Sequence, residues 1–280
     1  MFKDFKIYLF LLILIILGFV FYNNRVIIKE YFTKQENIKL PEEIKFVEIE
    51  REDLGVEENN DDIKSVEAEN FPSLQNDENI NDGLLESLPN PRVQEINLAV
   101  PFTIQSPDQK WDELYKEGCE EACVLMVYSF LNNQNISMDS ALKDIGEMIY
   151  WQIENWNGHF DLSATTTAEM AKEFYNLDIE IIELSSIEQI KDIIRTGYPL
   201  ILPCAGRELK NPNFKQPGPL YHMLIVKGFT KDGLIITNDP GTRKGKDYVY
   251  QPDILWNAIA DWDYNLKNPN QNEKVGIILK

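Results

Sequence analysis

The stretch Glu117-Gly118-Cys119-Glu120-Glu121-Ala122-Cys123 places a thiol directly after a glycine, at the start of a predicted helix. Apolar residues then recur every three or four positions as far as Leu131, which predicts a helix with one buried stripe. The positive end of the helix dipole lowers the pKa of a cysteine at this position and favours the nucleophilic thiolate. We therefore expect Cys119 to be reactive, while a small buried core residue is the alternative for a lone cysteine on an apolar helix.

An imidazole and a carboxylate follow the thiol in the chain. His222 is one of only two histidines and opens an apolar run, and Asp239 comes seventeen residues later, past the next predicted strand. Thiol, imidazole and carboxylate are the nucleophile, the base and the orienting group of a cysteine hydrolase. A hairpin turning symmetrically at Asp232-Gly233 would place Asp239 opposite Val226, four residues from His222. Contact between the two side chains therefore requires a bulge or an offset turn.

The order of the predicted elements indicates the fold class. Apolar periodicity predicts helices over residues 119–131, 139–152, 166–175 and 186–195, the third of them beginning at a capping box of Thr166 and Glu169. Short apolar runs then predict strands at 200–203, 221–229, 234–238, 248–250 and 275–279, with one more helix at about 253–261. Helices packed on a later antiparallel sheet form an α+β fold.

The N-terminus carries an apolar segment that is shorter than a typical membrane span and longer than the apolar part of a signal peptide. Residues 7–22 contain no charged side chain, and lysines or arginines lie on both sides of them. A membrane span needs roughly 20 apolar residues, and the apolar part of a signal peptide is shorter than this segment. Because no small-residue cleavage site follows, we expect residues 1–30 to form an uncleaved signal anchor, a single transmembrane helix. A cleaved signal peptide is the alternative.

An acidic stretch separates this segment from the rest of the chain. Residues 41–95 hold seventeen Asp or Glu and four Lys or Arg, a net charge of −13 out of −19 for the chain. A segment with few aromatic residues and high net charge cannot bury enough apolar surface to fold. We expect residues 31–95 to be a disordered linker, with binding to a basic partner as the alternative, and residues 96–280 to form one domain.

Charge and cysteine count exclude some functions. Nucleic-acid binding depends on clusters of Lys and Arg, and none stands out in this acidic chain, so we expect no nucleic-acid partner. Three cysteines leave at least one thiol free and do not make a disulfide framework. Since no second histidine lies at ligand spacing from Glu120 and Glu121, we expect no metal and no other cofactor.

Several short motifs together resemble a known family. They are residues 100–105 (Val-Pro-Phe-Thr-Ile-Gln), Trp111, Gly118 to Ala122, the Tyr221-His222 pair before an apolar strand, and Asn238-Asp239-Pro240. This set is similar to the stand-alone relatives of the bacteriocin-processing, double-glycine leader peptidases, which are papain-like cysteine peptidases. The resemblance covers most of residues 97–280 and none of the acidic stretch or the apolar segment.

The resemblance implies a fold and a role for each candidate residue. It implies the papain-like arrangement, with Cys119 as nucleophile, His222 as base, Asp239 as orienting carboxylate and Gln105 as an oxyanion-hole donor. Gln109 is a rival to Gln105, which lies fourteen residues before the cysteine rather than about six as in the transporter-linked members. Those members also have Asp before and Gly after the cysteine, where this chain has Gly118 and Glu120.

These observations predict a membrane-anchored cysteine peptidase that cleaves a peptide or a cell-wall amide. A domain outside the cytoplasm, held at the cell membrane by one span, is implied by the resemblance, since the charges flanking the span do not decide its orientation. A peptidoglycan-directed amidase or endopeptidase and a catalytically silent binding module are the alternatives. Other residues are expected to be structural: Cys123 and Cys204 in the core and His159 in a turn, with Trp111 either in the core or beside the site.

Overall fold

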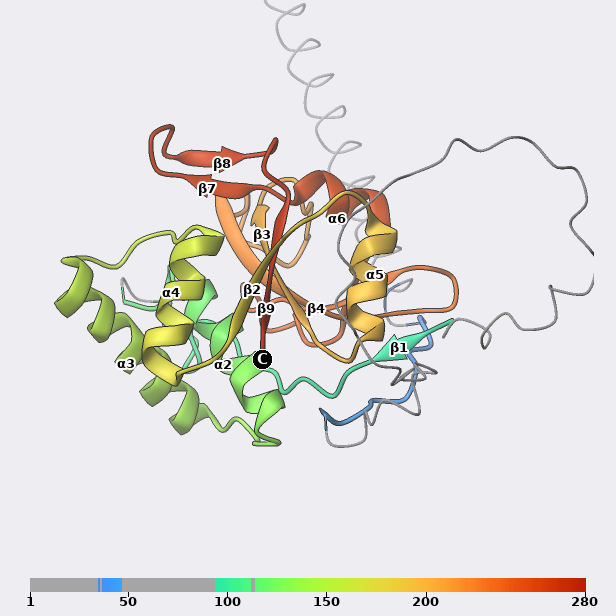
Figure 1. The fold of residues 1–280 in the computed structure, drawn as a ribbon, viewed down its shortest axis with the longest axis horizontal. Coiled ribbons are helices and arrows are strands. Elements are labelled where there is room, and N and C mark those ends of the chain that lie inside the picture. The colour runs from blue at the N-terminus through green and yellow to red at the C-terminus, as the bar shows by residue number, and fades with distance from the viewer. Residues whose placement is uncertain (1–34, 36, 47–93, 112–113) are drawn as a thin grey trace, which may run out of the picture.

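An antiparallel sheet of seven strands is the centre of the computed structural model, which describes residues 35, 37–46, 94–111 and 114–280 (Figure 1). The strand order is β2-β9-β3-β4-β5-β6, and β1 pairs with β4 outside this path. β7 and β8 form a separate two-stranded hairpin. The strands are β1 (Ile96–Asn97), β2 (Ile179–Glu183), β3 (Leu200–Ala205), β4 (Tyr221–Phe229), β5 (Ile235–Asn238), β6 (Tyr248–Tyr250), β7 (Asp261–Asp263), β8 (Asn268–Asn270) and β9 (Val275–Leu279).

Three helices that precede most of the strands pack together on one side of the sheet (Figure 1). They are α2 (Cys119–Leu131), α3 (Met138–Trp156) and α4 (Ala164–Tyr175). Two shorter helices follow, α5 (Ile187–Arg195) against β3 and β4, and α6 (Pro252–Ala258) after β6. The predicted α+β class with helices packed on an antiparallel sheet is confirmed.

The helix that begins at Cys119 is the central one. It packs on β4 and contacts both α3 and α4, so that eleven of its thirteen residues are buried. Its bounds agree with the prediction, because the apolar positions that define them are the ones that face the core. Burial extends beyond the predicted stripe to Glu120 and Glu121, which are 1% and 0% exposed.

A β-bulge shifts the register between β4 and β5. Val226 pairs with Thr237 and Gly228 pairs with Ile236, so Lys227 is the extra residue. Ile225 then lies opposite Asn238, so the same register places Asp239 opposite Leu224, two residues closer to His222 than in a symmetric hairpin. The turn supplies one residue of this offset, since Phe229 pairs with Ile235 rather than with Ile236, and the bulge supplies the other.

Strand β1 explains why this bulge is stable. A Cβ at Gly228 would lie 2.2 Å from the carbonyl oxygen of Ile96, so only glycine allows β1 to cross here. The carbonyl of Lys227 accepts from the N–H of Leu98 at 2.8 Å. Lys227 itself is fully buried, and its ammonium lies 2.6 Å from Asp247 and 2.9 Å from Glu43.

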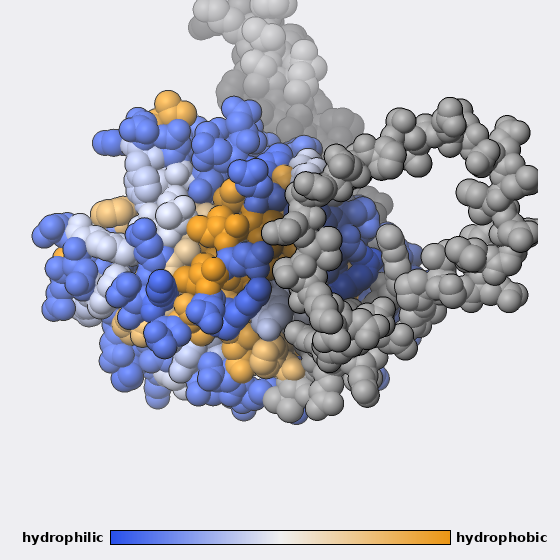
Figure 2. Space-filling view, viewed as in Figure 1, coloured by the Kyte–Doolittle hydropathy of each residue, from blue (hydrophilic) through white to orange (hydrophobic). Residues whose placement is uncertain are grey.

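Several details of the predicted elements are wrong. The short strands β1, β7 and β8 were not predicted, and α3 ends at Trp156 rather than at residue 152. Helix α4 begins at Ala164 rather than at Thr166, because Ser163 is the N-cap and accepts from the N–H of Thr166. Helix α6 ends at Ala258, and Asp261 already belongs to β7. The prediction had no strand at β2, an edge strand whose Ile181 is 41% exposed. Figure 2 shows apolar residues at the centre of the face in view, where Figure 1 places β2 and β9.

Part of the predicted linker packs against the domain. Ile44 pairs with Leu98 in a parallel bridge, its N–H donating to Asn97 and its carbonyl accepting from Ala99, both at 2.8 Å. The ring of Phe46 lies edge-on against Phe130, with centroids 5.5 Å apart. Residues 37–46 thus belong to the folded unit that was predicted to begin at residue 96.

The predicted anchor and most of the predicted acidic linker lie outside the described residues. Residues 1–34, 36 and 47–93 are not described, so both assignments stay predictions. Within the part of the chain that the structure describes, no helix is both long enough and apolar enough for a membrane span.

Candidate active site

Cys119 is the first residue of α2 and is 4% exposed. The preceding residue, Gly118, is the N-cap and provides no side-chain cap. A Cβ at Gly118 would lie 3.3 Å from the carbonyl oxygen of Tyr115 and 3.4 Å from that of Gln105. Glycine therefore lets the segment that carries Gln105 approach the start of the helix closely.

The thiol of Cys119 is protonated in this arrangement. Its S–H donates to Glu120 Oε2 at 3.0 Å. Burial raises the pKa of Cys119 well above its usual value, and the neighbouring charge of Glu120 raises it further. The expected lowering of this pKa by the helix dipole is therefore wrong for this state, because burial and a carboxylate at hydrogen-bond distance outweigh the dipole.

His222 and Asp239 form a buried pair. His222 Nε2 lies 2.8 Å from Asp239 Oδ1, and the side chains are 2% and 0% exposed. His222 is the second residue of β4, and Asp239 directly follows β5, so the bulge between these strands brings the two together. In the tautomer that fits this contact, Nε2–H donates to the carboxylate and Nδ1 is left as an acceptor.

Asp239 accepts four hydrogen bonds. Oδ1 accepts from His222 and from the backbone N–H of Gly241 at 3.0 Å, and Oδ2 accepts from the Tyr250 hydroxyl at 2.7 Å and from Asn211 Nδ2 at 3.0 Å. Burial alone would raise the pKa of Asp239, but His222, Tyr250 and Gly241 outweigh it and hold this pKa below its usual value. The carboxylate is therefore ionised beside the imidazole at neutral pH.

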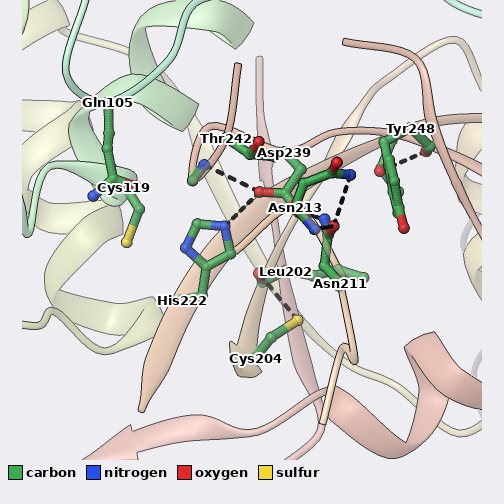
Figure 3. Close-up of polar contacts among 12 residues, drawn as sticks. Gln105, Cys119, Leu202, Cys204, Asn211, Asn213, His222, Asp239, Thr242 and Tyr248 are labelled. Atoms are coloured by element: carbon green, nitrogen blue, oxygen red, sulfur yellow. Dashed lines mark hydrogen bonds and ion pairs between the residues drawn. The ribbon is translucent and has the colours of Figure 1, made fainter. Parts of the chain in front are cut away.

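The thiol and the imidazole approach from opposite sides of the site. Figure 3 shows Cys119 and His222 with the ring nitrogen that does not bind Asp239 on the edge toward the sulfur. Among the described residues, no hydrogen bond joins the Cys119 thiol to the ring, since the thiol donates to Glu120. The geometry thus brings the three predicted groups into one region, with the thiol bound to a different partner.

Gln105 lies next to Cys119 (Figure 3). Its side chain is buried, and Nε2 donates to the carbonyl of Lys116 at 2.6 Å. Its backbone N–H donates to the carbonyl of Pro240 at 3.0 Å, which links this segment to the turn that carries Asp239. The rival Gln109 is exposed and accepts from Arg243 at 3.1 Å, so the structure favours Gln105.

Sequence reasoning missed the residues that surround the pair. Tyr250 was predicted only as part of a strand, and Asn211 lies in a region without any predicted element. Phe214 packs edge-on against His222 with ring centroids 5.3 Å apart. A Cβ at Gly241 would lie 2.8 Å from Cε1 of His222 and 2.9 Å from the Phe214 ring. The Asp-Pro-Gly turn was the one available signal, since it pointed to close packing after the carboxylate.

The remaining residues that the sequence analysis discussed are Cys123, Cys204, His159 and Trp111. Cys123 and Cys204 are buried, and neither forms a disulfide. His159 Nε2 lies 3.3 Å from Glu121 Oε1. Trp111 is 39% exposed, so it is not a core residue. Among the described residues, no group of three or more His, Cys, Asp or Glu side chains is placed to hold a metal ion.

Two solved structures are similar to parts of this chain, both at low sequence identity. A C39-like peptidase from Bacillus anthracis matches with 13% sequence identity and a TM-score of 0.43, over 66% of this chain and 98% of that one. A fragment of prointerpain A from Prevotella intermedia matches with 16% identity and a TM-score of 0.29, over 52% of this chain and 43% of that one. No curated protein matches the sequence.

The sequence itself matches one protein family. The family is described as the Peptidase_C39 like family, and its sequence model matches residues 97–268, which is more than half of the chain. This range includes every candidate site residue and the surrounding hydrogen-bond partners. The chain therefore belongs to the Peptidase_C39 like family, as the resemblance to the papain-like leader peptidases predicted.

Proposed function

We propose that this protein is a membrane-anchored cysteine peptidase that cleaves a peptide or amide bond with Cys119, His222 and Asp239. The observation that carries the proposal is the buried His222–Asp239 pair, 2.8 Å apart, with the second ring nitrogen on the edge toward the Cys119 sulfur. Membership of a peptidase family supports the same conclusion. The proposed chemistry requires no metal and no other cofactor.

In the proposed reaction, His222 Nδ1 takes the thiol proton while Nε2–H stays bonded to Asp239. The thiolate attacks the carbonyl carbon, and the C–N bond breaks as the imidazolium returns the proton to the leaving amine. Water then hydrolyses the thioester, with His222 again as the base. Asp239 keeps the ring in the required tautomer and offsets the positive charge that develops on it.

The oxyanion that forms on attack needs two hydrogen-bond donors. In this proposal the backbone N–H of Cys119 and the side-chain amide of Gln105 supply them. The Gln105 Nε2 donates to the carbonyl of Lys116 at 2.6 Å and has only a long contact of 3.5 Å to the carbonyl of Tyr115, which the oxyanion would replace as the acceptor of its second hydrogen. One such donor contributes about 2.7–4 kcal/mol to transition-state stabilisation. We therefore expect Gln105→Ala to lower the rate of cleavage by about 10²–10³-fold without a matching loss of stability.

The proposal is tested with an irreversible thiol-directed peptide analogue. The full chain is incubated near neutral pH with a peptidyl chloromethyl ketone, and the modified residue is identified by mass spectrometry. We expect modification of Cys119 and loss of it in His222→Ala, with the buried Cys123 and Cys204 as internal controls. If Cys119 in the folded chain does not react while a control cysteine peptidase does, the peptidase proposal fails.

A silent binding module is the second candidate function. It is favoured by one observation, the protonated and buried thiol that donates to Glu120 rather than to His222. The labelling experiment separates the two, because a silent module leaves Cys119 unmodified. Incubation of the purified chain with a peptide library and with peptidoglycan then distinguishes a protein-directed peptidase from a wall-directed amidase or endopeptidase by the products released.

The proposed location is the cell membrane, with the domain outside the cytoplasm. The apolar residues 7–22 support an anchor, and the family resemblance supports an exported domain. Alkaline extraction of membranes should leave the full chain in the membrane fraction, whereas a variant without residues 1–30 should be released. Protease added to intact cells should degrade the domain. Degradation only after cell lysis would contradict the proposed orientation.

A further inference from the structure

A buried carboxylate lies in direct contact with the candidate nucleophile. Glu120 is 1% exposed, and both of its oxygens have hydrogen-bond donors. Oε2 accepts from the Cys119 thiol at 3.0 Å, and Oε1 accepts from the backbone N–H of Leu162 at 2.9 Å. This side chain lies in the first turn of α2, and its burial is a finding of the structure.

Glu120 also connects the nucleophile to the strand of the base. The carbonyl of Leu162, whose N–H binds Glu120, accepts from the Tyr221 hydroxyl at 2.8 Å. Tyr221 is 3% exposed and directly precedes His222 on β4. The carboxylate is therefore held by the backbone of one loop residue, which is itself fixed to β4. Within the described part of the chain, its other hydrogen-bond partner is the thiol.

The charges around Glu120 are mostly negative. Burial raises the pKa of Glu120 well above its usual value, and Glu121 and Asp161 raise it further. Burial and Glu117 raise the pKa of Asp161 to about 6. The titratable or charged groups that face this cluster are Glu117, Cys119, Glu121 and Cys123 on or before α2, His159 and Asp161 on the following loop, and Tyr221 and His222 on β4.

We propose that Glu120 is a positioning residue that holds the Cys119 thiol in the resting site, so that the thiol must exchange Glu120 for His222 before it can transfer its proton. This inference rests on the proposed peptidase function. The geometry that carries it is the S–H bond to Glu120 together with the absence, among the described residues, of a bond between the thiol and His222.

The charge of Glu120 sets the direction of the effect. Because the pKa of Glu120 is itself raised, the effect belongs to the pH range above it, where the ionised carboxylate repels a thiolate at 3.0 Å and accepts a hydrogen bond that only the neutral thiol can donate. A neutral group at this position removes the repulsion. In Glu120→Gln, the side-chain oxygen can still accept from Leu162, and the amide can donate to the thiolate. The variant therefore keeps the hydrogen bond to Leu162 and favours the thiolate of Cys119, where the wild type favours the neutral thiol.

The experiment measures the rate of Cys119 alkylation by iodoacetamide in the full chain as a function of pH, with mass spectrometry to count only Cys119. We expect Glu120→Gln to lower the apparent pKa of Cys119 by about one unit or more, which is about tenfold more thiolate at a pH below both values. Glu120→Asp keeps the charge, so its apparent pKa should stay near that of the wild type. Glu121→Gln is the matched control, since it removes the same charge from a residue that does not touch the thiol, and its shift should be smaller.

A purely structural role for Glu120 predicts a different result. It predicts that Glu120→Gln changes the melting temperature but leaves the pH profile of alkylation unchanged, and this would overturn the proposal. A Glu121→Gln shift as large as that of Glu120→Gln would also overturn it. The wild type provides a test that needs no variant: thiolate absorbance at neutral pH that disappears on brief alkylation of Cys119, as checked by mass spectrometry, would contradict a thiol held by Glu120.

The same experiment separates this proposal from the proposed function. If His222→Ala lowers the alkylation rate while Glu120→Gln has no effect, the catalytic pair stands and the role of Glu120 fails. If Glu120→Gln shifts the profile while His222→Ala has no effect and no peptide is cleaved, the peptidase proposal fails.

Discussion

The Tyr250 hydroxyl offers the most direct test of the network around Asp239. It donates to Asp239 Oδ2 at 2.7 Å, and Tyr250 is 1% exposed. Tyr250→Phe keeps the ring and removes this donor, together with the oxygen that accepts from Asn211 Nδ2 at 3.0 Å, while Asp239 keeps three other donors. A hydrogen bond to a charged group contributes about 1.5–3 kcal/mol to stability. We therefore expect the free energy of unfolding at about pH 7 to fall by that amount.

The loss should depend on pH because Asp239 is ionised in the folded chain. Burial opposes ionisation, but His222 and Tyr250 are among the groups that lower the folded pKa of Asp239. A carboxyl with a lowered folded pKa contributes stability above its unfolded pKa of about 3.9, and this contribution is lost as the pH falls through the folded pKa. Removing the Tyr250 donor raises the folded pKa, so the variant loses this contribution at a higher pH. The difference between variant and wild type should be complete at about pH 7 and shrink below about pH 4.

Urea denaturation followed by circular dichroism, at about pH 7 and at about pH 3, measures both quantities. Tyr248→Phe is the matched control, because it removes a hydroxyl from the same strand, and the four donors to Asp239 are His222, Gly241, Tyr250 and Asn211. A Tyr250→Phe loss that is the same at both pH values would refute the reasoning. A loss in Tyr248→Phe with the same size and the same pH dependence would refute it as well.

Three further variants test the packing around the site. Gly241→Ala adds a Cβ that would lie 2.8 Å from His222 Cε1, so the ring must move; we expect Cys119 labelling by the peptidyl probe to slow by about 10- to 100-fold. Lys227→Met leaves two partly exposed carboxylates without their buried cation, and urea denaturation should show a loss of about 1–3 kcal/mol. Phe46→Ala should cost about 1–3 kcal/mol by the same assay, and wild-type stability would show that residues 37–46 are not part of the folded unit.

The sequence predicted the elements whose signal is local. The helix at 119–131 and the strands at 221–229 and 275–279 have the predicted bounds, because their apolar residues face the core in the expected period. Strand β2 was missed because it is a short edge strand of five residues, two of them glutamates. The start of α4 was misplaced since Ser163 and Thr166 are both suitable caps, and only the structure distinguishes them.

The site depends on contacts that leave no local signal. The register that brings Asp239 to His222 is set by the bulge at Lys227, and β1, more than a hundred residues earlier, fixes that bulge. The hydrogen-bond donors Tyr250 and Asn211 are common residue types in unremarkable surroundings. The state of the Cys119 thiol depends on how deeply the helix start is buried, and the dipole argument contains no such information.

The two sides of the site are held to different degrees. Asp239 accepts four hydrogen bonds and fixes the imidazole, and the backbone of Gln105 is bound to Pro240 at 3.0 Å, so neither group can move without breaking buried contacts. Among the described residues the thiol has one hydrogen-bond partner, Glu120, and the Cys119 side chain can change that partner by rotation about its own bonds. The reactivity of the site should therefore depend mainly on which group the Cys119 thiol binds. Tyr250→Phe should change mainly stability, whereas Glu120→Gln should change mainly the pH profile of the thiol.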